Sequence, residues 1–253
     1  MSITALITGA TSGFGKAIAQ KFAASGYRVI ITGRRAERLE ELKASLEKDF
    51  KAAVLPLCFD VRNRTAVMDT ISQLPEGWRS IDVLVNNAGL ALGRDYFDEA
   101  SLDDWDTMID TNVKGLLYVS KACLPFMLPN QKGHIINIGS TAAKEVYEKG
   151  NTYCATKHAV ESLSQGMRID LLRHGIKVTA IHPGAADTEF SNVRFKGDDS
   201  QARKVYEGYQ PLAAEDVADV VFYTTTLPAH VCINDLVLTC TSQANSIYLH
   251  KKG

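Results

Sequence analysis

This sequence of 253 residues has no long hydrophobic run, no CxxC cysteine pair and no histidines at the spacing of metal ligands. Its apolar runs fall far short of the length that a transmembrane helix needs, so we expect no membrane span. The lack of ligand spacing among the six histidines predicts that there is no metal site. Because the five cysteines lie in or beside apolar segments, we expect buried free thiols in a reducing cytosol. These cysteines are Cys58, Cys123, Cys154, Cys232 and Cys240.

A strong charge of either sign is also missing, since the formal net charge is -1. Such a balance argues against nucleic acid or an anionic membrane as a partner. The first residues, MSITALITGATSG, carry no basic segment and run directly into a glycine turn, so we interpret them as a first strand and not as a signal peptide. The expected location is the cytoplasm.

What the sequence does have is a regular alternation of short apolar runs with longer amphipathic ones. The alternation predicts an α/β protein, a single doubly wound parallel sheet (Rossmann fold) with helices on both faces, in one domain over 1–253. The candidate strands are 3–7, 28–32, 53–59, 81–86, 134–139, 177–182 and 234–239. The candidate helices are 14–25, 36–49, 64–74, 103–129, 153–174 and 214–227. Right-handed crossovers place all strand carboxyl ends on one edge, where ligands bind in such sheets.

Two segments near the end of the chain do not fit this alternation. Residues 183–199 are long for an ordinary loop and follow the sixth strand, so we expect a lid over the ligand site, at about 184–210. The tail, 241–253, is expected either to fold over a neighbouring subunit or to fray.

The first strand ends in a glycine-rich turn, 8-TGATSGFG-15, which opens a helix. Gly9 permits a tight turn, Gly13 lets backbone amides approach a pyrophosphate, and Gly15 lets the helix pack close to the sheet. The spacing is GxxxGxG, not GxGxxG, and glycines also mark plain turns between strands and helices. Its position after the first strand favours a dinucleotide site.

The end of the second strand, 32-TGRRAER-38, bears on the choice of dinucleotide. Sites for NAD place a carboxylate there for the ribose 2′-hydroxyl, whereas this chain has Arg34 and Arg35. A guanidinium matches a 2′-phosphate in bidentate fashion, so we predict a preference for NADP(H). The alternative is a basic helix start on a solvated face.

The segment 152-TYCATKHAVESL-163 places Tyr153 and Lys157 one turn apart on one helical face. A phenol that works near pH 7 must ionise about three pH units below its usual value, which corresponds to about 4 kcal/mol. A unit cation about 4 Å away, at an effective dielectric near 20, supplies approximately that much. We therefore expect Lys157 to lower the pKa of Tyr153. The alternative is a surface pair without a role.

Three further features lie at predicted strand ends or in the long helix. Ser140, in 137-NIGSTAA-143, follows the fifth strand and is either a donor to a substrate oxygen or a plain cap. The segment 86-NNAG-89 follows the fourth strand and suits a close backbone approach to a cofactor ribose. Asn112 and Gly115 are poor helix formers, so we expect a local kink that frees a carbonyl to hold a water.

Taken together, these motifs resemble the short-chain dehydrogenase/reductase family, collinearly from Thr8 to about Thr188. The resemblance implies a catalytic tetrad of Asn112, Ser140, Tyr153 and Lys157, with Asn112 holding a water that links Lys157 to solvent. It also implies that Asp60 meets the adenine, that Asn86 to Gly89 line the adenosine ribose, and that Thr188 holds the nicotinamide carboxamide. Family members that take NADP often carry a basic residue where this chain has Ser12. The two arginines are therefore the main evidence for the predicted preference for NADP(H). The full set of expected cofactor contacts is Gly9, Thr11, Ser12, Gly13, Phe14, Gly15, Arg34, Arg35, Asp60, Val61, Asn87, Ala88, Gly89, Tyr153, Lys157, Pro183, Gly184 and Thr188.

Within the family, the segments 86–93, 188–199 and 227–234 look like those of NADP-dependent 3-hydroxy acid dehydrogenases. That resemblance implies oxidation of serine, allo-threonine or 3-hydroxypropionate, or reduction of a semialdehyde. The stretch 142–151 departs from the pattern, because it carries four charged residues where such members are less charged. For the substrate carboxylate, Arg194 or Lys196 in the lid is the candidate cation. The resemblance also implies a homotetramer formed through the helices near 113–128 and 154–172.

Two other interpretations stay open at this point. A carbonyl reductase or 3-oxoacyl thioester reductase would keep the fold and change the substrate. A non-catalytic dinucleotide sensor would bind NADP(H) only to adjust a protein contact, although such a protein has no need of Tyr153 and Lys157.

Overall fold

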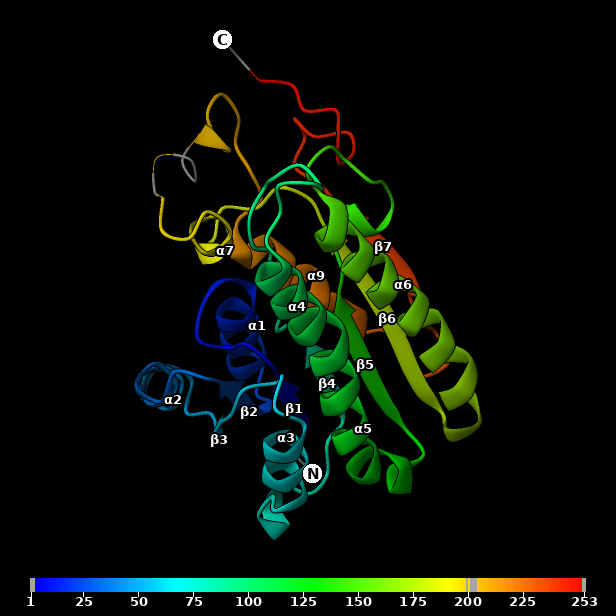
Figure 1. Ribbon diagram of the computed structural model, residues 1–253. Coiled ribbons are helices and arrows are strands. Elements are labelled where there is room, and N and C mark those ends of the chain that lie inside the picture. Colours follow the sequence, from blue (N-terminus) through cyan, green and yellow to red (C-terminus); the bar gives the residue numbers. More distant parts are fainter. Residues whose placement is uncertain (1–2, 199, 201–203, 252–253) are drawn as a thin grey trace.

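A computed structural model describes residues 3–198, 200 and 204–251. The described chain forms a sheet of seven parallel strands in the order β3-β2-β1-β4-β5-β6-β7 (Figure 1). The strands are β1 (Thr4–Ile7), β2 (Arg28–Gly33), β3 (Val54–Cys58), β4 (Val83–Asn86), β5 (Gly133–Ile138), β6 (Ile176–Pro183) and β7 (Asp235–Leu238). The strand order reverses between β1 and β4, which is where a doubly wound sheet binds its ligand. The predicted fold class is therefore confirmed.

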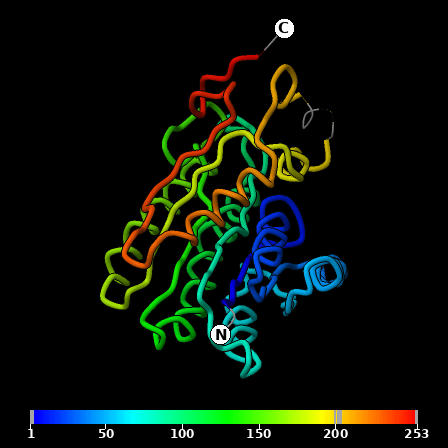
Figure 2. Tube along the Cα trace, turned by 180° about the vertical axis from the view of Figure 1, so that it is seen from behind, coloured from blue at the N-terminus to red at the C-terminus, as the bar shows by residue number. Residues whose placement is uncertain are grey.

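Helices cover both faces of this sheet, as Figures 1 and 2 show from opposite sides. One face carries α1 (Gly13–Ala24), α2 (Ala36–Phe50) and α9 (Ala214–Thr225). The other side carries α3 (Arg64–Ser72), α4 (Leu102–Ile109), α5 (Leu116–Met127) and α6 (Asn151–Leu171). Single turns of helix are η1 (Glu76–Trp78), η3 (Leu128–Asn130), η4 (Thr141–Ala143) and η5 (Leu172–His174).

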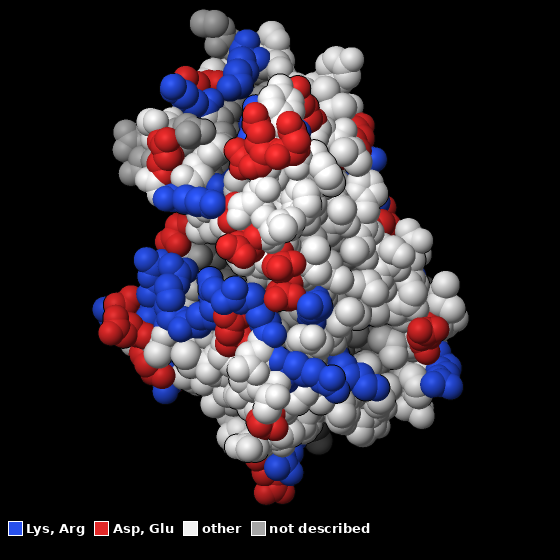
Figure 3. Space-filling model, in the orientation of Figure 1, with Lys and Arg blue, Asp and Glu red and all other residues white. Residues whose placement is uncertain are grey.

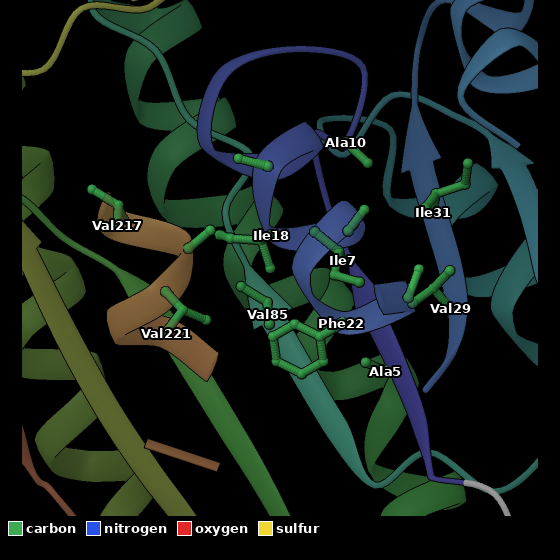
Figure 4. Close-up of a cluster of buried hydrophobic side chains, with 14 of the residues drawn as sticks. Ala5, Ile7, Ala10, Ile18, Phe22, Val29, Ile31, Val85, Val217 and Val221 are labelled. Atoms are coloured by element: carbon green, nitrogen blue, oxygen red, sulfur yellow. The ribbon is translucent and has the colours of Figure 1, made fainter. Parts of the chain in front are cut away.

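The largest core cluster lies between the sheet and the pair α1 and α9 (Figure 4). Phe22 of α1 and Val221 of α9 are fully buried there against Ile7 and Val85 of the central strands. A second cluster fills the opposite face, with Ile71 of α3 among its buried members. Because both faces are covered, the strands are apolar almost throughout, which explains why they were recognisable as continuous apolar runs.

The long helix predicted over 103–129 is interrupted by a π-helical turn, η2 (Asp110–Gly115), between α4 and α5. Gly115 lies against Val61, where an added Cβ would come within 2.8 Å of the valine Cγ2. The predicted local defect around Asn112 is confirmed, and it turns the buried Asn112 side chain toward the strand ends.

The predicted lid is less irregular than expected, because Glu189–Arg194 forms a short helix, α7. Thr188 caps it by accepting a hydrogen bond from the Phe190 backbone N–H at 3.2 Å. Residues 199 and 201–203 of the lid lie outside the described residues.

The described residues 241–251 of the tail pack on their own chain, so they do not fray, and folding over a neighbouring subunit stays a prediction. The Gln243 side-chain oxygen accepts from the Ala185 backbone N–H at 2.7 Å, and the Ser246 N–H donates to Glu145 at 3.0 Å. These bonds join the tail to the lid base and to the loop before α6.

Among the cysteines, Cys123, Cys154 and Cys240 are buried and free as expected, and Cys232 is partly buried. Cys58 is exposed instead, because β3 is the edge strand of the sheet and ends at the surface. Across the described residues, every helix is too short or too polar to cross a bilayer.

Candidate active site

The carboxyl ends of β1, β4, β5 and β6 meet at one edge, where two adjoining cavities open. The first, of about 290 Å³, runs from the glycine turn past Arg34 and Arg35 to Tyr153 and Lys157. The second, of about 1010 Å³, lies under the lid and the tail. Tyr153 lines both cavities, so it stands where a bound dinucleotide and a second molecule would meet.

The glycine turn has the backbone that an anion site needs. Gly9 and Gly13 adopt φ of +67° and +49°, which favours glycine strongly. A Cβ on Gly15 would collide with the Gly9 carbonyl oxygen and with the Asn87 side chain. The capping residue Ser12 makes no side-chain bond to the start of α1, and the first helical residues Gly13 and Phe14 line the first cavity, so the N–H groups of this turn are available to an anion.

The predicted arginine pair lies at the outer end of the first cavity. The Arg35 guanidinium donates to the hydroxyls of Thr11 at 2.8 Å and Ser12 at 3.0 Å, and lies 3.3 Å from Glu189 of α7. The Arg34 guanidinium lies 3.8 Å from the carboxylate of Asp60. Figure 3 shows lysine and arginine side chains gathered over the start of α2, beside a hollow.

Asp60 and Val61, which follow β3, line the same cavity. Burial works against ionisation of Asp60, but hydrogen bonds from Arg62 more than offset it and lower the pKa of that carboxyl. Asn87, Ala88 and Gly89 also line the cavity, together with Thr11 and Phe14.

One expected ribose contact is wrong, because Asn86 points into the interior. Its amide donates to Ser120 at 2.9 Å and to Asn137 at 2.8 Å, and the residue is almost fully buried. Pro183 and Gly184, expected beside the cofactor, line the second cavity. Thr188 lines both.

Tyr153 and Lys157 lie on one face of α6, as their spacing predicts, and both are buried, at 8% and 6% exposed. The Lys157 ammonium donates to the Ile138 carbonyl oxygen at 3.0 Å and lies 5.9 Å from the Tyr153 ring centroid. The alternative of an idle surface pair is therefore excluded.

The expected acidification of the phenol by Lys157 is not found in this structure. Burial raises the pKa of Tyr153 above its usual value, and the lowering influences on it are a hydrogen bond from Ser140 and the charge of Arg194. Burial also lowers the pKa of Lys157 to about 8. Desolvation is the largest influence on both side chains, and the ammonium is hydrogen-bonded to a carbonyl oxygen.

Ser140 follows β5 and caps the short helix η4, accepting from the Ala142 N–H at 3.1 Å. The two interpretations of this serine are compatible, since Ser140 and Tyr153 line the second cavity together and the Ser140 side chain acts to lower the pKa of the phenol. It lines the second cavity at the point where that cavity meets the phenol.

Asn112, in the π-helical turn, fixes the loop after β4. Its side chain accepts from the Leu90 N–H at 2.8 Å and donates to the Leu90 carbonyl at 2.8 Å and to Thr156 at 3.0 Å. These bonds tie α6 to the loop that carries Gly89. The water-holding role of Asn112 stays a prediction.

Of the two cations expected to meet the substrate, only Arg194 reaches the site. Its guanidinium lies 5.6 Å from the Tyr153 ring centroid and donates to the Tyr147 hydroxyl at 3.3 Å. Lys196 instead pairs with Asp104 at 2.9 Å and lines neither cavity. Two residues of the site, Tyr147 and Phe190, were not predicted from the sequence, and both line the second cavity with Tyr153. The sequence marks them only as aromatic residues, one in the charged stretch 142–151 and one in the lid.

Comparisons with known proteins agree with this geometry. The profile of a family described as short chain dehydrogenase matches residues 3–199. The NADP-dependent 3-hydroxy acid dehydrogenase YdfG of Escherichia coli strain K12 is 51% identical over 240 residues, 94% of this chain and 95% of that protein. Sulfoacetaldehyde reductase 2 of Chromohalobacter salexigens is 46% identical over 249 residues, 98% of each chain. Among solved structures, the closed form of a serine dehydrogenase complexed with NADP+ superposes with a TM-score of 0.92, at 48% identity over 99% of this chain and 100% of that one.

Replacing Lys157 by Met should stabilise the cofactor-free protein at pH 7, by on the order of 2 kcal/mol of unfolding free energy, because it removes a buried ammonium. Folding lowers the pKa of Lys157 from 10.5 to about 8, so the unfolded chain binds more protons between these pH values. Wild-type stability then rises with pH across that window. The gap between variant and wild type should therefore be largest below pH 8 and shrink toward pH 10.5 in urea unfolding.

The matched control is Lys177→Met, because the Lys177 ammonium donates to the carbonyls of Pro228 and Val231 near the surface. That control should lower stability. A Lys157→Met protein that is less stable than wild type at pH 7 would contradict the reading of Lys157 as an unfavourable buried charge.

Proposed function

The chain belongs to the short-chain dehydrogenase family, and on that premise we propose that this oxidoreductase uses NADP(H) to interconvert short 3-hydroxy acids and their 3-oxo acids or semialdehydes. The observation that carries the proposal is the position of Arg194, a fixed cation beside the proton-transfer group Tyr153. A short 3-hydroxy acid has a hydroxyl and an anionic end separated by a few bonds, so one small molecule can reach both side chains.

For the cofactor, the fit rests on the first cavity. The glycine turn offers the N–H groups of α1 to a pyrophosphate, and Arg34 and Arg35 border the far end, where a 2′-phosphate would add negative charge. The relatives' dependence on NADP supports the same choice. When bound, the nicotinamide supplies hydride chemistry at the substrate carbon.

The protein's own residues then divide the remaining work. The Ser140 hydroxyl orients the substrate oxygen toward Tyr153, and the phenol exchanges a proton with that oxygen. Lys157, held on the Ile138 carbonyl, lines the first cavity together with the phenol and would bind the cofactor ribose there. Asn112 locks α6 against the loop of Gly89, so that these groups keep their spacing.

A second anionic substrate has a specific observation in its favour. The relative that reduces sulfoacetaldehyde is 46% identical over nearly the whole chain. A guanidinium binds a sulfonate as well as a carboxylate, so Arg194 is compatible with either group. A neutral ketone or an acyl thioester would leave the Arg194 charge without a partner in the cavity.

A substrate screen tests the proposal directly, following reduced nicotinamide with NADP+ and NADPH. The panel contains serine, allo-threonine, 3-hydroxypropionate, malonic semialdehyde, sulfoacetaldehyde, a simple ketone and a 3-oxoacyl thioester. We expect the acids or semialdehydes to give the highest kcat/KM. Preference for the neutral ketone or the thioester would support the carbonyl or thioester reductase alternative, and no turnover at all would support the dinucleotide sensor.

We further propose a single-domain, cytoplasmic enzyme that assembles as a homotetramer. Apolar side chains stay exposed on the predicted interface helices, including Leu117 of α5 and Ile169 of α6, the latter 74% exposed. Such surface is typical of an interface.

Replacing Tyr153 by Phe should lower kcat by about 10²- to 10⁴-fold, because it removes the proton donor and acceptor. Cofactor affinity, measured by fluorescence titration, should stay near wild type.

Because burial raises the pKa of Tyr153, the wild-type phenol stays protonated at neutral pH and suits the reductive direction. Oxidation needs the phenolate, so its kcat/KM should rise with pH through the alkaline range; a plateau from pH 7 upward would contradict this state.

Replacing Arg35 by Ala should weaken NADP(H) binding by about 10- to 100-fold and leave NAD(H) binding nearly unchanged, since only the 2′-phosphate loses a charged partner. The control is Arg28→Ala at the opposite end of β2, where the guanidinium lies over the Trp78 ring at 4.1 Å. Equal losses for both dinucleotides would remove Arg35 from the 2′-phosphate site.

Replacing Arg194 by Ala should raise KM for 3-hydroxy acids by about 10- to 100-fold, through loss of a charge-assisted hydrogen bond. Lys196→Ala provides the control, because Lys196 lies two residues away and pairs with Asp104 outside the cavities. If both variants keep the wild-type KM, the anionic end of the substrate binds elsewhere.

A further inference from the structure

A fully buried histidine, His182, lies directly beside the peptide group of Ser140. It stands near the end of β6, and its ring packs on Gly139, where an added Cβ would collide with Nδ1. The Nδ1 atom lies 3.3 Å from the Ser140 backbone nitrogen and 3.1 Å from its carbonyl oxygen. No other part of the mechanism described above uses this ring.

The other ring nitrogen meets two carboxylates that come from different elements. His182 Nε2 lies 2.7 Å from a carboxylate oxygen of Glu161 of α6 and 2.9 Å from one of Asp235 of β7, in close polar contacts that lack the alignment of a hydrogen bond. The Lys144 ammonium lies 2.5 Å from Asp235 and 3.4 Å from Glu161. The lysine therefore supplies a positive charge that stabilises these two carboxylates. This contact gives a structural role to Lys144, one of the four charged residues of the stretch 142–151.

Two carboxylates beside Nε2 favour a proton on that nitrogen, and Nδ1 then accepts from the Ser140 N–H. In the other tautomer, Nδ1–H donates to the Ser140 carbonyl oxygen instead. Both are neutral forms of the ring, and either one joins it to the serine peptide group. Burial, and secondarily the charge of Lys144, lowers the pKa of His182 and supports this neutral state.

We propose that His182 positions Ser140: the ring is clamped by Glu161 and Asp235 on one side and holds the serine peptide group on the other. The inference rests on the proposed role of Ser140 in orienting the substrate oxygen. Since Ser140 lies two residues after the end of β5, the clamp sets where its hydroxyl stands relative to Tyr153. His182 acts through the serine and touches neither substrate nor cofactor.

Two substitutions separate the two sides of the ring. His182→Asn keeps a polar atom at the position of Nδ1 but no longer reaches the carboxylates, whereas His182→Gln extends toward the carboxylates and loses the acceptor for Ser140. We expect His182→Gln to lower kcat by about 10²-fold, the size of a misplacement of about 1 Å, with KM and cofactor affinity little changed. His182→Asn should recover most of that loss.

The matched control is His134→Gln, because His134 is also buried in the sheet but lies at the opposite end of β5, bonded to Thr179 at 2.7 Å. It should lower the melting temperature without changing kcat. Equal kcat losses in His134→Gln and His182→Gln, or a wild-type kcat in His182→Gln, would overturn the proposal.

Ser140→Ala, measured alone and combined with His182→Gln, distinguishes this inference from the proposed function. If Ser140→Ala leaves kcat unchanged, the role of the serine fails and the inference fails with it. If Ser140→Ala lowers kcat strongly but His182→Gln does not, only the inference fails. We expect the double variant to be no slower than Ser140→Ala, because His182 acts through the serine; fully additive losses would contradict that path.

Discussion

Burial of a phenol and an ammonium one helical turn apart is the constraint on which the site depends. Tyr153 and Lys157 are both nearly inaccessible on α6, in a position that disfavours a charge on either of them. The fold supplies few partners in compensation: the Ile138 carbonyl for Lys157, and Ser140 with Arg194 for Tyr153. Because this environment disfavours both charges, we expect the pKa values of both side chains to change when a ligand brings charge or hydrogen bonds to them.

Much of this arrangement follows from the sequence, for physical reasons. The strand carboxyl ends meet at one edge because the strands are parallel, and that rule predicts that Gly9, Gly89 and Ser140 lie together, whereas Thr188 was expected there from the family resemblance. The spacing of Tyr153 and Lys157 fixed their shared face, because helical geometry is local. The defect around Asn112 was also predictable, since two poor helix formers, Asn112 and Gly115, lie three positions apart.

The sequence does not predict the directions of long side chains or the contacts between residues that are distant in the chain. Lys157 faces a carbonyl of β5 rather than the phenol, and Lys196 turns outward to Asp104, although both lie in the predicted segments. His182 showed no ligand spacing, because its two carboxylates lie 21 residues before it and 53 after it, counted from Glu161 and Asp235. The tail reaches Ala185 through Gln243, a contact that no local pattern encodes.

In the cofactor-free protein, burial and not the Lys157 charge governs the proton affinity of the phenol. NMR titration of protein labelled at the tyrosine ζ-carbons measures this most directly, with the Tyr153 signal assigned by its absence in a Tyr153→Phe sample. We expect Tyr153 to keep the chemical shift of a protonated phenol at least up to the ordinary tyrosine pKa of 10.0. A transition of that signal well below pH 10, absent when Lys157 is replaced, would show instead that the lysine charge is the dominant influence on the phenol.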